Sequence, residues 1–105
     1  MNMTKIKIGQ VGDFPEGKLK GITIEGEKVL IVKVKGKLYA TSSICTHEEG
    51  ALEEGELEDY QIKCPLHSAV FDIRDGRVVE APAELPLKTF KVSVKGDDVF
   101  LDIKK

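Results

Sequence analysis

Short runs of alternating apolar and polar residues, separated by glycine-containing turns, constrain the fold of this 105-residue chain more than any other feature. The alternation has a period of two residues, which is typical of β-strands with one buried face. The predicted strands cover residues 21–24, 28–34, 37–41 and 88–94. The turns between such runs fall at 25–27, 35–37, 75–76 and 95–98, where glycine supplies the positive φ that hairpins need. We therefore predict an antiparallel all-β fold.

The size and charge of the chain exclude several classes of protein. With 41% hydrophobic residues the chain can bury one modest core, so we expect a single domain over residues 1–105. A net charge of -2 does not suit a nucleic-acid binder. The longest apolar runs, such as Val29 to Val32, are too short to span a membrane, and no apolar signal stretch follows Met1. We expect a cytoplasmic monomer.

The acidic residues are concentrated in one segment. Residues 48–59 hold seven acids and no base, namely Glu48, Glu49, Glu53, Glu54, Glu56, Glu58 and Asp59. Gly50 and Gly55 interrupt any helix here, so we expect a loop with a turn of helix or a short strand near residues 55–57. The segment is either a solvated face or a docking surface for a basic partner.

The cysteines and histidines indicate a metal site. All four lie in two groups, Cys45-Thr46-His47 and Cys64-Pro65-Leu66-His67, and each group offers one sulfur and one nitrogen. Such ligands at short spacing on two loops are what a metal centre needs. Two thiolates and two imidazoles could hold tetrahedral zinc, although zinc sites usually have their two cysteines close together in the sequence and their two histidines close together. Mixed loops suit a two-iron centre, with both cysteines on one iron and both histidines on the other.

The spacing of these two groups resembles the Rieske signature, and the resemblance continues through Phe71-Asp72, Asp75-Gly76-Arg77, Pro82-Ala83 and Leu87. It implies a soluble Rieske-type ferredoxin with a [2Fe-2S] cluster, in which Cys45 and Cys64 bind the buried iron and His47 and His67 the outer one. It also implies an antiparallel β sandwich with an inserted cluster-binding subdomain, at about residues 43–84. Pro82 would lie in a third loop that covers the cluster.

Four positions depart from the pattern of Rieske proteins in cytochrome bc complexes. Gly50 and Leu66 stand where those proteins carry a disulfide, so packing must hold the loops together. Ala69 and Phe71 replace a Ser and a Tyr that donate hydrogen bonds to cluster sulfurs. Without those donors the reduction potential should lie at the low end of the Rieske range, roughly -150 mV. Ser68, where glycine is common, could restore one donor.

The resemblance implies a one-electron carrier, without catalytic residues of its own, that passes electrons from a flavin-dependent ferredoxin reductase to a terminal oxygenase or similar acceptor. A complete Rieske oxygenase is excluded, because its mononuclear iron needs two further histidines and the chain has only two. A zinc-stabilised β interaction module and a small subunit of a nitrite-reductase-type enzyme stay as alternatives. Asp72 and Asp75 are interpreted as turn residues.

Overall fold

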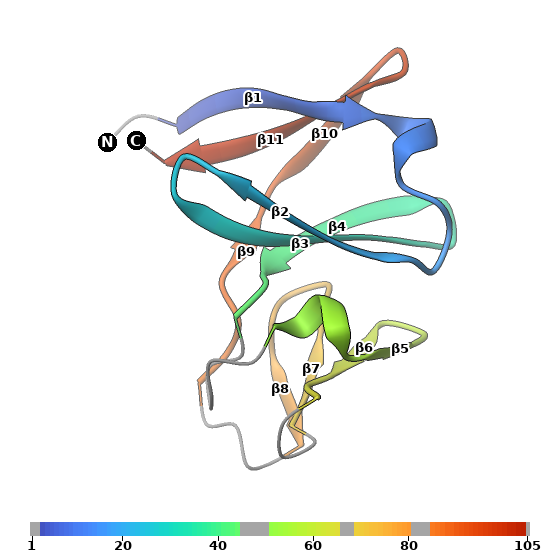
Figure 1. The fold of residues 1–105 in the computed structure, drawn as a ribbon, viewed down its shortest axis with the longest axis vertical. Helices are drawn as coiled ribbons and strands as arrows, with labels where there is room; N and C mark the ends of the chain where they lie inside the picture. Colours follow the sequence, from blue (N-terminus) through green and yellow to red (C-terminus); the bar gives the residue numbers. More distant parts are fainter. Residues whose placement is uncertain (1–2, 45–50, 66–68, 81–84, 105) are drawn as a thin grey trace.

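The computed structural model describes residues 3–44, 51–65, 69–80 and 85–104, which form three antiparallel sheets (Figure 1). The strands are β1 (Met3–Gln10), β2 (Leu19–Ile24), β3 (Glu27–Val34), β4 (Lys37–Ser42), β5 (Glu56–Glu58), β6 (Gln61–Lys63), β7 (Val70–Asp72), β8 (Val78–Glu80), β9 (Thr89–Phe90), β10 (Val92–Lys95) and β11 (Asp98–Lys104). Two 3-10 turns, Val11–Asp13 and Leu52–Glu54, complete the regular structure of these residues. In this part of the chain no helix could span a membrane.

The sheets stack as three layers. Their strand orders are β1-β11-β10, β2-β3-β4-β9 and β5-β6-β7-β8, and the second sheet lies between the other two (Figure 1). The first strand pairs with the last, so the two ends of the chain lie side by side. The predicted all-β sandwich is confirmed, and each of the four predicted turns joins two strands.

The central strand β3 is buried on both faces, so the prediction of one buried face is wrong for residues 28–34. Leu30, Val32 and Val34 pack against the small sheet β5–β8. Val29 and Ile31 point the other way and pack against β11. The reason is visible in the sequence, because Val29 to Val32 is a continuous apolar run rather than an alternating one.

The run predicted as one strand over residues 88–94 is divided in two. Residues 89–90 form β9, which pairs with β4 in the middle sheet, while residues 92–95 form β10, which pairs with β11. The chain changes sheets at Lys91, a corner typical of sandwiches. Phe90 and Val92 both pack against the core between these sheets, which is why one alternating pattern runs through the corner.

Residues 43–88 form an insertion between β4 and β9, which we call the small lobe. The other two sheets form the large lobe. The backbone N–H of Ser42 donates to the carbonyl oxygen of Lys88 at 2.8 Å, so the chain leaves and re-enters the middle sheet at adjacent positions. The segment expected to be a loop contains the 3-10 turn Leu52–Glu54 and the short strand β5, as predicted. The turn at Asp59 between β5 and β6, where φ is 53°, was not predicted.

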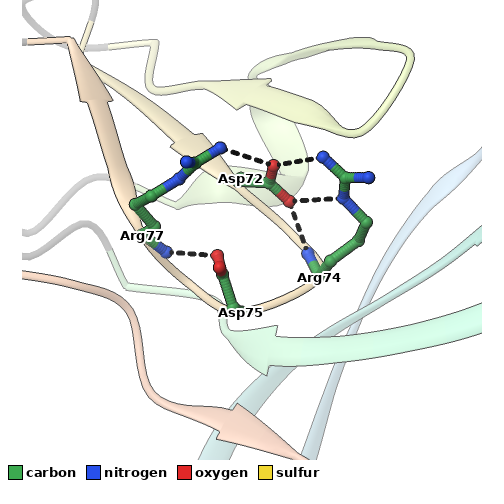
Figure 2. A network of polar contacts seen from close by, with 4 residues as sticks. All are labelled: Asp72, Arg74, Asp75 and Arg77. Atoms are coloured by element: carbon green, nitrogen blue, oxygen red, sulfur yellow. Dashed lines mark hydrogen bonds and ion pairs between the residues drawn. The ribbon is translucent and has the colours of Figure 1, made fainter.

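A buried carboxylate organises the turn between β7 and β8 (Figure 2). The Asp72 side chain is 3% exposed and accepts hydrogen bonds from Nη2 of Arg74 at 2.7 Å and from Nε of Arg74 at 3.1 Å. It also accepts one from Nη2 of Arg77 at 3.3 Å. Asp75 is exposed and accepts from the backbone N–H of Arg77 at 2.9 Å. Both acids therefore serve the turn, but only Asp72 carries a buried charge.

The shared core predicts how the protein unfolds. We expect Leu30→Ala to lower the free energy of unfolding by about 2–5 kcal/mol, because the side chain is fully buried between the small lobe and the middle sheet. Circular dichroism follows all sheets, while tyrosine fluorescence follows Tyr39 and Tyr60, whose rings meet across the two lobes at 5.9 Å. Both signals should move together to lower urea concentration.

The exposed Val94, with 51% of its surface accessible, supplies the control for this measurement. Val94→Ala should change the free energy of unfolding by less than about 0.5 kcal/mol. Two separate transitions in the wild-type protein would contradict a core shared by the lobes.

Acid should remove the stabilisation that Asp72 provides. Hydrogen bonds from the Arg74 side chain, opposed by burial, lower the pKa of Asp72 from 3.8 to about 2. Because the folded-state pKa is depressed, this contribution is complete above about pH 5 and is lost as pH falls towards 2. The shift corresponds to about 2 kcal/mol. The difference in unfolding free energy between wild type and Asp72→Asn, from urea titrations, should shrink below pH 4. An unchanged difference at pH 3 would contradict this origin.

Candidate metal centre

The first predicted ligand loop, which carries Cys45 and His47, is closed at its base by backbone contacts. Ile44 and Ala51 form an isolated antiparallel bridge, and the N–H of Leu52 donates to the carbonyl oxygen of Ser43 at 2.8 Å. The loop therefore leaves β4 and returns directly into the 3-10 turn of the small lobe. Both predicted ligands of this loop lie outside the described residues.

The second predicted loop begins at Cys64, directly after β6. The Cys64 residue is 2% exposed, and its N–H donates to the carbonyl oxygen of Ala69 at 2.7 Å. This hydrogen bond closes the loop at the start of β7, and β6 and β7 pair in register behind it. His67 lies outside the described residues, as do the other positions singled out in the sequence near the site: Gly50, Leu66, Ser68 and Pro82.

The bases of the two loops lie against each other. Leu52, which ends the first loop, belongs to the same buried cluster as Cys64 and Ala69. Gly55 follows in the chain, and a Cβ at this position would collide with the carbonyl oxygen of Lys63. Its φ of -85° suits any residue, so close approach of two backbones is what requires glycine here. The loop that carries Cys-X-His and the loop that carries Cys-X-X-His therefore both begin at one end of the small lobe.

The described part of this end fits an iron–sulfur centre. Cys64 belongs to a buried apolar cluster, where a thiolate would be stable only with a cation beside it. Ala69 and Phe71 are fully buried and offer no side-chain hydrogen-bond donor, as expected from the sequence. Within the described ranges no three His, Cys, Asp or Glu side chains form a metal site. Three of the four predicted ligands are outside those ranges.

The acidic segment presents a charged surface beside the second loop. Glu54, Glu56 and Glu58 are exposed, and Glu56 and Glu58 border a 250 Å³ groove on the outer face of the small sheet together with Glu80 and Lys63. Glu53 differs from them, because it is only partly exposed and its carboxylate lies against Gly21 of β2. One member of the predicted acidic surface therefore packs between the lobes.

Comparison with known proteins assigns the family. Residues 4–91 match the Rieske [2Fe-2S] domain. The chain is 38% identical over 91 residues to the ferredoxin component of a naphthalene 1,2-dioxygenase system from Pseudomonas aeruginosa, covering 87% of this chain and 88% of the relative. It is 39% identical over 102 residues to the ferredoxin component of biphenyl 2,3-dioxygenase from Rhodococcus jostii, covering 97% and 95%.

Solved structures agree. The ferredoxin of carbazole 1,9a-dioxygenase from Nocardioides aromaticivorans superposes with a TM-score of 0.92 at 28% identity, covering 96% of this chain and 99% of that one. A ferredoxin in complex with the oxygenase of a carbazole 1,9a-dioxygenase gives 0.86 at 29% identity, with 91% and 99% covered.

A small subunit of an NADH-dependent nitrite reductase from Mycobacterium tuberculosis also superposes, with a TM-score of 0.88 over 100% of this chain and 99% of that one. Its sequence identity is only 12%, so this likeness concerns the fold alone. The fold therefore does not separate the two kinds of protein, and the sequence relationship does. The chain belongs to the Rieske [2Fe-2S] domain family, and within it to the ferredoxins that carry electrons in dioxygenase systems.

Proposed function

We propose that Cys45, His47, Cys64 and His67 bind a Rieske [2Fe-2S] cluster, and that the chain takes electrons from a flavin-dependent reductase and delivers them to a terminal oxygenase. The observation that carries the proposal is the meeting of both loop bases at one end of the small lobe, with Cys64 buried there. When bound, the cluster supplies reversible one-electron chemistry. The reducing cytoplasm suits such a protein, since its thiols stay reduced there.

The residues of the chain would divide the work at the cluster. Cys45 and Cys64 supply two thiolates on the inner side, while His47 and His67 supply two neutral imidazoles on the outer side. Leu52 and Ala69, both fully buried, exclude water from the side of Cys64. Because Ala69 and Phe71 add no side-chain donor, we place the potential at the low end of the Rieske range, roughly -150 mV.

The partner surface follows from charge. Glu54 and Glu56 are exposed near Cys64, and Glu58 is exposed at the hairpin between β5 and β6. Together they would attract a basic patch on the reductase or oxygenase. A short-lived redox complex needs such steering more than a large apolar interface. The solved complex of a related ferredoxin with its oxygenase supports the oxygenase as electron acceptor.

The cluster is tested by visible and electron paramagnetic resonance spectra of the purified protein before and after dithionite, with iron and acid-labile sulfide analysis. We expect two irons, two sulfides and a reduced signal of low average g, as mixed Cys and His ligation gives. Cys64→Ser and His67→Asn should each lose the signal. Ser93→Ala, in the outermost sheet, should keep it. A colourless wild-type protein with one zinc would overturn the proposal.

The docking surface is tested by the rate of electron transfer to a Rieske oxygenase as a function of ionic strength. The triple variant Glu54→Gln, Glu56→Gln, Glu58→Gln should transfer electrons more slowly at low salt, by about tenfold, and should show a weaker salt dependence. At high salt the variant and wild type should converge, since screening removes the steering.

The control neutralises two exposed acids in other turns, Glu25→Gln between β2 and β3 and Asp97→Asn between β10 and β11. This pair should keep the wild-type salt dependence. A salt dependence unchanged in the triple variant would show that the acidic segment is only a solvated face.

A further inference from the structure

Asp72 is the single charged side chain that is buried among the described residues. Two guanidinium groups neutralise it from either side, with the contacts shown in Figure 2. Its backbone takes part as well, because the N–H of Asp72 donates to the carbonyl oxygen of Arg77 and its carbonyl oxygen accepts from Gly76. Taking a carboxylate out of water is costly unless donors satisfy it, so the position of this network in the fold is informative.

The first segment tied to Asp72 is the pair of strands β6 and β7, at the end of the pair away from the Cys64 loop. Asp72 is the last residue of β7 and lies opposite Gln61 of β6. Cys64 follows β6, and Ala69 precedes β7, and these two residues close the loop through their 2.7 Å hydrogen bond. The carboxylate is thus three residues from one end of the second ligand loop.

Arg74 extends the network to the turn between β5 and β6. Its guanidinium lies over the ring of Tyr60 at 4.2 Å, and the N–H of Ile73 donates to the carbonyl oxygen of Tyr60 at 2.8 Å. The Nζ atom of Lys35 lies 5.1 Å from the centre of the same ring, and the ring centre of Tyr39 in β4 lies 5.9 Å from it. The turn that begins β6 is therefore fixed to Asp72 and, through the tyrosines, to the middle sheet.

Arg77 extends the network to a third segment, the stretch that follows the turn. This stretch runs from Arg77 through β8 to Leu87. At its end, the N–H of Leu87 donates to the carbonyl oxygen of Gly76, the residue before Arg77, at 2.8 Å. Gly76 has φ 78°, and a Cβ there would collide with the carbonyl oxygen of Leu87. Both ends of the stretch 77–87, which contains Pro82, therefore meet at the turn that Asp72 organises.

We propose that Asp72 is a positioning residue for the cluster. Through Arg74 and Arg77, it sets how the Cys64 loop and the stretch 77–87 are placed relative to each other. The proposal rests on the function proposed above. It makes Asp72 a determinant of how tightly the cluster is enclosed, and hence of its lifetime and potential, although no ligand comes from Asp72 itself. Neither the sequence pattern, which indicates only a turn at Asp72, nor the ligand set points to such a role.

The variants Asp72→Asn and Arg77→Gln distinguish a positioning role from two alternatives. One is a purely electrostatic effect on the potential, and the other is a purely structural effect on stability. An electrostatic effect would raise the potential in Asp72→Asn and lower it in Arg77→Gln, since one removes a negative and the other a positive charge. A structural effect would lower the free energy of unfolding and leave the potential and the spectrum unchanged. Loss of positioning exposes the cluster in both variants, and exposure to water favours the more negative reduced state.

The experiment measures three quantities on the iron-loaded protein: the reduction potential, the g values of the reduced cluster, and the rate at which visible absorbance is lost to excess iron chelator. We expect cluster loss to be about tenfold faster in Asp72→Asn and about threefold faster in Arg77→Gln. The potential should rise in both variants, and the g values should shift or broaden in both. Arg77→Lys, which retains a positively charged donor for Asp72, should recover most of the wild-type rate.

Asp75→Asn is the matched control, because it removes one carboxylate charge from the same turn while the amide oxygen can still accept from Arg77. It should behave as wild type in all three measurements. Opposite shifts of potential in the two test variants would overturn the proposal. If Asp72→Asn fails to fold, a lower potential in Arg77→Gln, or unchanged rates and g values in that variant, would overturn it alone. Absence of iron and sulfide from the wild-type protein would instead refute the proposed function.

Discussion

The burial of β3 on both faces is the constraint from which the rest of the architecture follows. Val29 and Ile31 face one core, and Leu30, Val32 and Val34 face the other, so a single strand of alternating orientation joins three layers. The interiors on either side are close-packed, and separating the small lobe would expose the second core to water. The ligand loops are therefore carried on a lobe that is anchored by apolar packing rather than by a flexible linker.

Apolar packing alone does not determine the course of the turns and returning segments at the edge of the small lobe. There the chain uses directional interactions: the Asp72 carboxylate with its two arginines, and the Gly76 carbonyl oxygen with Leu87. Desolvation of the carboxylate is tolerated because several donors satisfy it at once. The division is physically sensible, since hydrophobic burial is non-directional and hydrogen bonds fix orientation.

The sequence predicted those features of the fold that depend on local pattern. Alternation and glycine turns identified β2, β3, β4 and the hairpins between them, because these strands pair with their neighbours in sequence. Pairing of β1 with β11 was not predictable in this way, since it joins opposite ends of the chain. The division at Lys91 was hidden because one alternating pattern continues through the sheet corner. The burial of Asp72 depends on arginines that only the folded turn brings to it.

The candidate site shows the same division between local and global information. The four ligands were predicted from residue type and spacing in two short groups, because metal chemistry restricts both, and they stay a prediction. The fold itself is less discriminating, since a nitrite reductase subunit at 12% identity shares it. The described residues of this chain add three features to that fold: the buried Cys64, exposed acids in the segment before it, and the polar network of Asp72. An electron carrier needs a rigid interior and a charged surface that partners can reach. Core-facing and outward-facing residues alternate along the short strands β5 and β6, so the same strands can supply both.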